Sequence, residues 1–340
     1  MKKVQIVYAV IASEKNRFFE ELWASVYSFR LYEPGREIRV LCDKPTHDYI
    51  IRFPEFVKLI DEIIVVDVSD TENLRFRSKE IKTNVRQYVT GPYLFVDTDT
   101  ICADSIAEID TFSYDIACVP EFHVPLKDSV FKHLVMGYIR NSFNEDITDE
   151  DAWYNSGVMY VNDTPKAYEV CRKWNENWKR SAFVNGHKQD QPPLLITHRE
   201  TGYAISELPG EYNCQVGLSV RFLAKAKIFH FLHFDYPKDQ SFNPFQSKDI
   251  YRKIKEDRGI YGETAEMIKN VKSIYPSPSC VVGWSTMNFL MSPAAPVFEM
   301  IYNEGGVASW LMLKMARWLD MEESPEQITE YFIATIEPIL

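Results

Sequence analysis

Two aspartates that directly follow a short apolar run are the residues of this sequence best suited to chemistry. Asp97 and Asp99 come after the run Tyr93–Val96 and are separated by Thr98. In an extended chain, side chains two residues apart point to the same side, so both carboxylates could enter one crevice. Paired carboxylates suit Mg²⁺ or Mn²⁺, which take further ligands from water and substrate phosphates. The alternative is that these aspartates only form a polar turn that ends a strand.

A basic helix face is predicted just ahead of this run. Lys79, Lys82 and Arg86 lie three and four residues apart within a helix expected over about residues 78–89, so they share one side of it. One interpretation is that one or two of these side chains meet phosphate charge near the aspartates. The other is a solvated basic face, which is the usual reason for such a run of charge.

The elements that must position these residues follow from an alternation of strands and helices. Apolar strands are expected over residues 4–12, 37–43, 62–68 and 93–97, with amphipathic helices between them. This order predicts a mostly parallel sheet with helices on both faces, and such sheets bind ligands past the carboxyl ends of their strands. The 13 glycines form neither G-x-G-x-x-G nor a Walker A sequence, which disfavours dinucleotide and P-loop sites.

Three later segments carry further candidate residues. Asn155 and Ser156 lead through Gly157 into an apolar strand, and the glycine would allow close approach of the backbone to a ligand or another strand. Asp190 precedes Gln191 and a Pro-Pro pair, and by itself needs to be no more than a helix N-cap. His230 lies in an apolar stretch, where a histidine is more often a satisfied core residue than a ligand.

Composition narrows the class of protein. The chain has 340 residues, of which 46% are hydrophobic and 26% charged, as in ordinary folded proteins. Its net charge of −11 and the lack of a long basic run disfavour a nucleic-acid partner. The six cysteines form no CxxC pair, so neither a zinc site nor a disulfide scaffold is indicated. The basic start is followed by an apolar run, residues 4–12, that is too short and too soon followed by charged residues for a secretion signal. A cytoplasmic location is therefore expected.

Taken in order, these motifs resemble those of the GT-A glycosyltransferases of the family 8 type, which includes glycogenin and bacterial lipopolysaccharide galactosyltransferases. The shared motifs are Lys82, the strand leading into the DxD motif Asp97-x-Asp99, Asn155–Met159, Asp190-Gln191, Leu208–Asn213 and His230-Phe231. The resemblance spans roughly residues 4–235. It implies an α/β fold with a GT-A-type mixed, mostly parallel sheet flanked by helices. We therefore expect a nucleotide-sugar glycosyltransferase domain over residues 1–240 and a helical C-terminal extension over residues 241–340.

The resemblance also implies an activity and a set of site residues. The expected reaction is metal-dependent transfer of a sugar from a nucleotide diphospho-sugar, a UDP-sugar, to a hydroxyl of a glycan or glycolipid acceptor, with retention of configuration. Mn²⁺ or Mg²⁺ would be held by Asp97, Asp99 and His230. The residues assigned to the donor nucleotide are Tyr8, Ala9, Val10, Lys82, Asp97, Thr98 and Asp99. Asn155, Asp190 and Gln191 would border the transferred sugar as the catalytic residues.

Two other functions fit parts of the sequence. A sugar-nucleotide-forming nucleotidyltransferase would carry a glycine-rich basic segment after the first strand, and residues 12–16 contain no glycine. A non-catalytic nucleotide-sugar or glycan-binding protein could share the fold, although the intact Asp97, Asp99, Asp190 and His230 argue against it. The helical extension is expected to pack on the sheet or on a second subunit. Its amphipathic stretch around Trp310 offers the alternative of peripheral contact with the inner face of a membrane.

Overall fold

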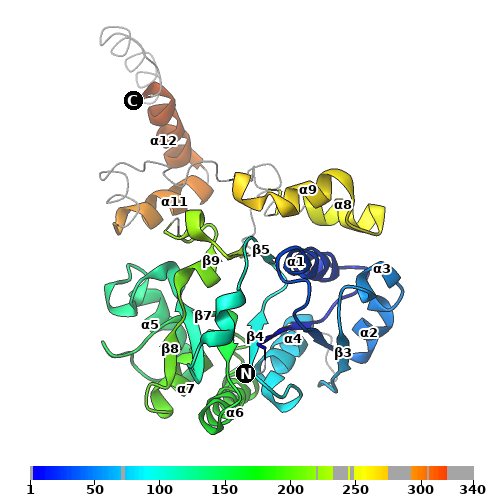
Figure 1. The fold of residues 1–340 in the computed structure, drawn as a ribbon. Helices are drawn as coiled ribbons and strands as arrows, with labels where there is room; N and C mark the ends of the chain where they lie inside the picture. The colour runs from blue at the N-terminus through cyan, green and yellow to red at the C-terminus, as the bar shows by residue number, and fades with distance from the viewer. Residues whose placement is uncertain are drawn as a thin grey trace. The chain divides into compact units, whose positions relative to one another are not determined.

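In the computed structural model, the first apolar run forms strand β1 (Gln5–Val10) inside a seven-stranded sheet (Figure 1). The strand order is β3-β2-β1-β4-β7-β6-β8. Strands β1 to β4 run parallel, whereas β7 is antiparallel to both of its neighbours. The other strands of this sheet are β2 (Ile38–Cys42), β3 (Glu62–Val65), β4 (Tyr93–Val96), β6 (Ile116–Pro120), β7 (Tyr154–Val161) and β8 (Ile205–Glu207). The expected mixed, mostly parallel sheet flanked by helices is confirmed.

The structure describes residues 3–69, 73–219, 221–232, 244–245, 249–274, 292–304 and 306–319. The chain forms two compact units, residues 1–279 and 280–340. In the described part of the second unit, helices α11 (Ala294–Glu304) and α12 (Gly306–Leu319) pack against each other. No helix among the described residues is both long enough and apolar enough to cross a membrane.

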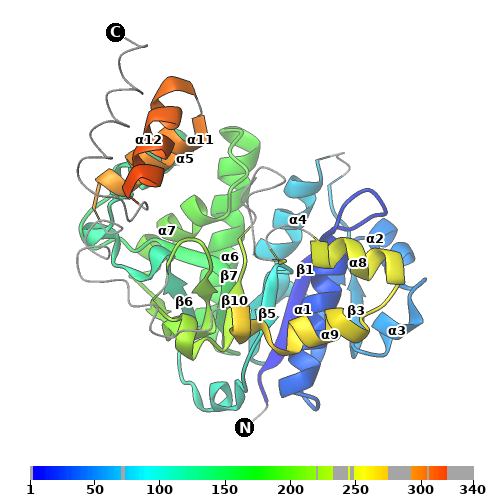
Figure 2. The same cartoon turned by 90° about the horizontal axis from the view of Figure 1, so that it is seen from above.

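Helices cover both faces of the large sheet because its central strands are apolar on both faces. In β1, Ile6 and Tyr8 pack into one core and Val7 and Ala9 into the other. The first core includes residues of α1 (Phe18–Tyr32), α2 (Lys44–Ile50) and α3 (Pro54–Val57). The second includes residues of α4 (Leu74–Thr83), α6 (Pro165–Lys179) and α7 (Gln191–Glu200), as the view in Figure 2 helps to show. Helix α5 (Lys132–Phe143) contributes to a smaller cluster with α7.

A second, three-stranded sheet carries the late part of the chain back to the end of β4. Its order is β5-β10-β9, formed by β5 (Thr100–Cys102), β10 (Ile228–His230) and β9 (Cys214–Gln215). His230 pairs in register with Thr100, and the Phe231 amide donates to the Asp99 carbonyl oxygen over 2.9 Å. Strand pairing therefore holds His230 beside the aspartates. The short helical turns are η1 (Val85–Gln87), η2 (Ala107–Thr111), η3 (Glu121–His123), η4 (Leu126–Asp128), η5 (Arg180–Val184), η6 (Gly210–Tyr212), η7 (Leu223–Lys225) and η8 (Val271–Ile274).

Helix boundaries differ from the expected ones where a capping residue decides them. The helix expected from about residue 78 begins at Leu74, because the Asn73 side chain accepts a hydrogen bond from the Phe76 amide over 3.0 Å. The same helix ends at Thr83, and η1 continues the expected range. Helix α7 begins at Gln191 in spite of two prolines, because the first turn of a helix tolerates proline.

Two helices beyond residue 240 belong to the first compact unit. Helix α8 (Asp249–Asp257) buries Ile250, Tyr251 and Ile254, and α9 (Gly262–Lys269) buries Ile268. All four side chains join the core that contains α1. The first compact unit therefore continues past residue 240, where we expected the glycosyltransferase domain to end.

An ion-pair network lies at the end of the sheet where strand β1 begins. The buried Arg36 side chain contacts Glu33 at 2.9 Å, Asp110 at 2.8 Å and the Val4 carbonyl oxygen at 2.8 Å. Burial opposes ionisation of Asp110, but the hydrogen bond from Arg36 outweighs it and lowers the pKa of Asp110. The network joins the end of α1, the start of β1 and η2, so it stabilises the edge opposite the aspartates.

We predict that Arg36→Met lowers the free energy of unfolding by about 3–5 kcal/mol, because it leaves two carboxylates without their partner. Since folding lowers the pKa of Asp110, the contribution of the pair is present above the ordinary carboxyl range and is lost as pH falls. Urea unfolding at neutral and acidic pH measures both effects. Arg39→Met is the control, because Arg39 pairs with the exposed Glu37 and Glu62 and should cost less than about 1 kcal/mol. Equal losses in the two variants would contradict the prediction.

Candidate active site

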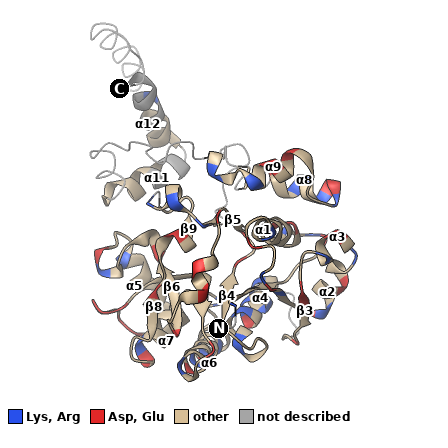
Figure 3. Ribbon diagram, in the orientation of Figure 1, with Lys and Arg blue, Asp and Glu red and all other residues tan. Residues whose placement is uncertain are grey.

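A cleft of about 860 Å³ opens past the carboxyl ends of β1 and β4. It is lined by residues 9–11, 15–18, 20, 74, 75, 78, 79, 97–99, 251, 252 and 255. Its cations are Lys15, Arg17, Arg75, Lys79, Arg252 and Lys255. They come from the loop that precedes α1, from α4 and from α8, and basic residues are blue in Figure 3. A local excess of positive charge in a chain of net charge −11 suits an anionic ligand.

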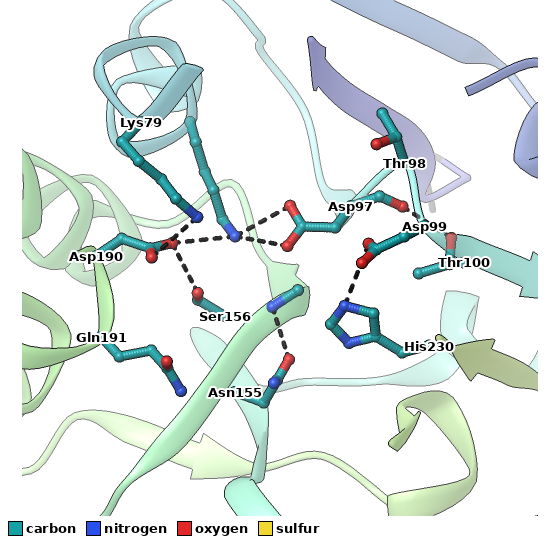
Figure 4. Close-up of polar contacts among 12 residues, drawn as sticks. Lys79, Asp97, Thr98, Asp99, Thr100, Asn155, Ser156, Asp190, Gln191 and His230 are labelled. Carbon is teal, nitrogen blue, oxygen red and sulfur yellow. Dashed lines mark hydrogen bonds and ion pairs between the residues drawn. The ribbon is translucent and has the colours of Figure 1, made fainter. Parts of the chain in front are cut away.

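Asp97 and Asp99 line this cleft, and His230 lies beside them (Figure 4). One ligand atom from each lies within 4.8 Å of the others, and His230 Nε2 is 3.3 Å from Asp99 Oδ1. The chain turns at residues 98–99 instead of staying extended, and the Thr100 hydroxyl donates to the Asp97 carbonyl oxygen over 2.9 Å. The segment is therefore a turn, as one interpretation held, and its carboxylates still converge. Two carboxylates and an imidazole are suitable ligands for Mn²⁺.

Amide side chains hold the His230 ring in one orientation. Its Nδ1 lies 3.1 Å from Asn213 Oδ1, an oxygen that can only accept, so Nδ1 donates to Asn213 and the ring presents Nε2 to Asp99. Asn213 in turn donates to Asn155 Oδ1 over 2.9 Å. A histidine whose second nitrogen is fixed in this way is typical of metal ligands.

Gly157 leaves the space that the His230 ring occupies. A Cβ atom on Gly157 would lie 2.2 Å from His230 Cε1, a distance that no packed structure tolerates. The Gly157 carbonyl oxygen also accepts from the Asp97 amide over 2.7 Å. The expectation was that this glycine would admit a ligand or another strand; the group that approaches it is the side chain of His230, a member of the candidate metal site.

A buried lysine joins the DxD segment to the start of α7. Lys82 Nζ lies 2.9 Å from Asp97 Oδ2 and 3.1 Å from Asp190 Oδ2, while Lys79 Nζ lies 2.9 Å from Asp190 Oδ1 (Figure 4). Ser156 donates to Asp190 over 2.8 Å. Burial alone would lower the pKa of Lys82, but Asp190 and Asp97 raise it; burial alone would raise the pKa of Asp190, but Lys79 and Lys82 hold it far below its usual range.

These contacts decide two earlier alternatives. Asp190 occupies the N-cap position of α7, but its side chain makes no capping hydrogen bond, so the interpretation of Asp190 as a mere helix cap is wrong. The basic face of α4 is not simply solvated, because Lys82 is buried between two carboxylates. Arg86, the third cation expected on this face, is also buried and donates to the Gly91 carbonyl oxygen.

Glu121 completes the site and was not predicted. Its Oε2 accepts from Asn155 and from Gln191, each over 2.8 Å. Burial raises the pKa of Glu121. The signal that could have found it is its place directly after the apolar strand β6, whose carboxyl end shares an edge with that of β4. The following residues Phe122 and His123 have φ values of 62° and 56°, a strained turn of the kind that often lies at functional sites.

The remaining predicted residues lie as follows. Ala9, Val10 and Thr98 line the cleft. Tyr8 does not: it is fully buried, and its hydroxyl lies 2.8 Å from Ser25 Oγ. Lys82 is also absent from the lining, where Lys79 takes its place.

A second cleft of about 450 Å³ lies next to the first and shares Arg75 with it. Its other lining residues are Asn73, Tyr138, Asn141, Ser142 and 186–189. The Tyr138 ring is partly exposed and stacks on Trp153, with 6.2 Å between ring centroids. The segment 186–189 leads directly into Asp190 and Gln191.

Comparison with known proteins gives fold-level neighbours only. No protein-family model and no curated protein sequence matches the chain. Among solved structures, it is similar to the galactosyltransferase LgtC in complex with donor and acceptor sugar analogues, at 12% identity and a TM-score of 0.49 over 78% of this chain and all of that one. It is similar to apo GlyE of Streptococcus pneumoniae, at 13% identity and a TM-score of 0.48 over 81% of this chain and 64% of that one. It is also similar to mouse xyloside xylosyltransferase 1, at 14% identity and a TM-score of 0.44 over 67% of this chain and 96% of that one. These neighbours are glycosyltransferases, and the family 8 assignment stays a prediction.

We predict that Gly157→Ala weakens Mn²⁺ binding by roughly 10–100-fold, because the new methyl group displaces the His230 ring. Electron paramagnetic resonance of free Mn²⁺ during a titration measures the affinity, and urea unfolding checks the fold. Gly137→Ala is the control: Gly137 lies in α5, where an added Cβ meets nothing within 4 Å. Unchanged Mn²⁺ affinity in Gly157→Ala would mean that His230 is not a ligand.

We predict that Lys82→Met lowers the free energy of unfolding by about 3–5 kcal/mol, since it removes the cation paired with Asp97 and leaves the buried Asp190 with Lys79 alone. Lys79→Met is the matched comparison and should cost much less, because Asp190 keeps Lys82 and the Lys79 side chain is partly exposed. Urea unfolding at neutral pH measures both. If the two variants lose the same stability, Lys82 is not the central bridge.

Proposed function

We propose that this chain is a metal-dependent glycosyltransferase that moves a sugar from a UDP-sugar to a hydroxyl of a glycan or glycolipid, with retention of configuration. The observation that carries the proposal is the convergence of Asp97, Asp99 and His230 beside a cleft lined by six cations. A nucleotide diphosphate that binds together with its metal needs two kinds of group in one site. Anionic side chains hold the divalent ion, and cationic side chains bind the phosphates.

Asp97, Asp99 and His230 would hold Mn²⁺ or Mg²⁺ in this proposal. The bound ion would stabilise the negative charge that develops on the leaving diphosphate. The cleft cations would share this charge, while the backbone of residues 9–11 would border the uracil ring. Asp190 fixes Lys79 and Lys82, so we expect it to act mainly by positioning charge.

Asn155 and Gln191 are the polar groups proposed to border the transferred sugar. Glu121 holds both amides through one carboxylate oxygen, so their orientations are coupled. In a retaining transfer the acceptor hydroxyl attacks on the same face as the departing diphosphate. The reaction then needs no dedicated base on the far face of the sugar, and it does need rigid polar groups around the reacting carbon.

The second cleft is the proposed location of the acceptor. It offers an exposed aromatic ring, Tyr138, together with the amides of Asn73, Asn141 and Gln189. Amides supply both donors and acceptors for sugar hydroxyls, and the ring supplies an apolar surface. The cleft adjoins the donor cleft at Arg75, so two substrates could be bound at once.

One observation keeps a second candidate function. Lys15 and Arg17, which follow β1, line the donor cleft, and a basic segment in this position also suits a sugar-nucleotide-forming nucleotidyltransferase. The products separate the two reactions: the transferase releases UDP from a UDP-sugar, whereas the alternative releases pyrophosphate from UTP and a sugar 1-phosphate. A non-catalytic binding protein would do neither. Contact of the C-terminal helices with a membrane or second subunit stays a prediction.

We predict that Asp99→Asn weakens Mn²⁺-dependent UDP binding by about 100-fold or more, because loss of a direct ligand should exceed the 10–100-fold typical of outer-shell changes. Calorimetry with and without Mn²⁺ measures this. The control is Asp104→Asn, the same chemical change at an exposed residue paired with Lys272. UDP affinity equal to that of the unchanged protein would contradict the metal role of Asp99.

A further inference from the structure

Helix α8 is fixed against α1 by its apolar side. Ile250, Tyr251 and Ile254 are buried in the core that α1 shares with β1. Lys255 donates to the carbonyl oxygen of Glu14, in the loop that joins β1 to α1. The helix is therefore held at the edge of the donor cleft by packing as well as by a polar contact.

Another side of α8 brings two cations to the cleft. Arg252 and Lys255 lie three residues apart, so they share one side of α8, and both line the cleft together with Tyr251. Lys253 lies between them and points elsewhere, to Glu263 of α9 at 2.7 Å. One helix thus carries two cations toward the cleft and one away from it.

The hydrogen-bond and ion-pair contacts of Arg252 and Lys255 hold these side chains weakly. Arg252 pairs with Asp249 at 3.3 Å, and both side chains are largely exposed. Such pairs contribute little to stability, so exchanging this partner for a phosphate is inexpensive. The Lys255 contact is to an exposed, neutral carbonyl oxygen, which a phosphate oxygen can replace with a stronger, charge-assisted hydrogen bond.

We propose that Arg252 and Lys255 bind the diphosphate of the donor nucleotide, which makes α8 a wall of the donor site and not part of an accessory extension. This inference rests on the proposed function and deepens it. Arg252 can bind phosphate oxygens with two parallel N–H groups, and Lys255 adds a second positive charge. Because α8 is already packed in place, binding needs little ordering of the helix.

The test combines removal of cations with removal of phosphates. Calorimetry in the presence of Mn²⁺ measures the affinity of the full chain for UDP, and competition against UDP measures the affinity for UMP and uridine. The variants are Arg252→Ala, Lys255→Ala and their combination. Lys253→Ala is the matched control, since it removes a cation from the same helix outside the cleft.

If the inference holds, each single variant binds UDP about tenfold more weakly, because hydrogen bonds between charged groups are strong ones. Uridine affinity stays unchanged, and the loss for UMP lies between the two. The double variant also shows a smaller dependence of UDP affinity on salt. The conservative Arg252→Lys, which keeps the charge, recovers part of the loss, and thermal unfolding confirms that each variant is folded.

Three results would overturn the inference. Equal losses for UDP and uridine would mean that the two cations do not contact phosphate. UDP affinities like that of Lys253→Ala would mean that α8 is only a neighbour of the site, while the proposed function stands. If the unchanged protein binds UDP no more tightly than uridine, the proposed function itself fails, and the role of α8 fails with it.

Discussion

The site depends on one buried cation, Lys82. A buried charge is costly unless it is paired, and Lys82 meets this condition by contacting Asp97 at the end of β4 and Asp190 at the start of α7. The bridge fixes two elements that are far apart in the sequence. It also compensates carboxylate charge, so that Asp97 can point toward Asp99 and His230 without strong repulsion from Asp190.

A chain of side-chain amides extends this order to the other side of the site. Glu121 orients Asn155, Asn155 orients Asn213, and Asn213 orients the His230 ring. Each buried polar group in this chain has a partner, so no member can rotate without leaving another unsatisfied. The missing side chain at Gly157 provides the space for the ring. Electrostatics fixes the carboxylates, and hydrogen bonding with close packing fixes the imidazole.

Local patterns predicted the parts of this arrangement that local physics decides. Strands buried on both faces read as continuous apolar runs, and the carboxyl end of β4 therefore indicated Asp97 and Asp99. Spacing alone could not separate Lys79 from Lys82, because it places both on one side of α4, and it was the family resemblance that singled out Lys82, the lysine that is buried in the fold. Glu121 was missed because its role arises from Asn155 and Gln191, which reach it only after the sheet has formed. The place of α8 in the lining of the cleft was not predicted, because no sequence pattern in residues 249–257 indicates that this helix lies near the end of β1.

Charge explains why a cleft for anions can exist in an acidic chain. The net charge of −11 would repel a nucleotide diphosphate at long range. Salt largely screens interactions between exposed charges that are farther apart than the Debye length, about 8 Å at physiological ionic strength. Inside the cleft the nearest charges decide, and six cations there face the acidic side chains Glu20, Asp97 and Asp99. A divalent ion bound by the aspartates would make the acidic part of the lining attract phosphate as well. The two sets of charges therefore act on the same anion only when the metal is bound, which couples donor affinity to the metal by electrostatics alone.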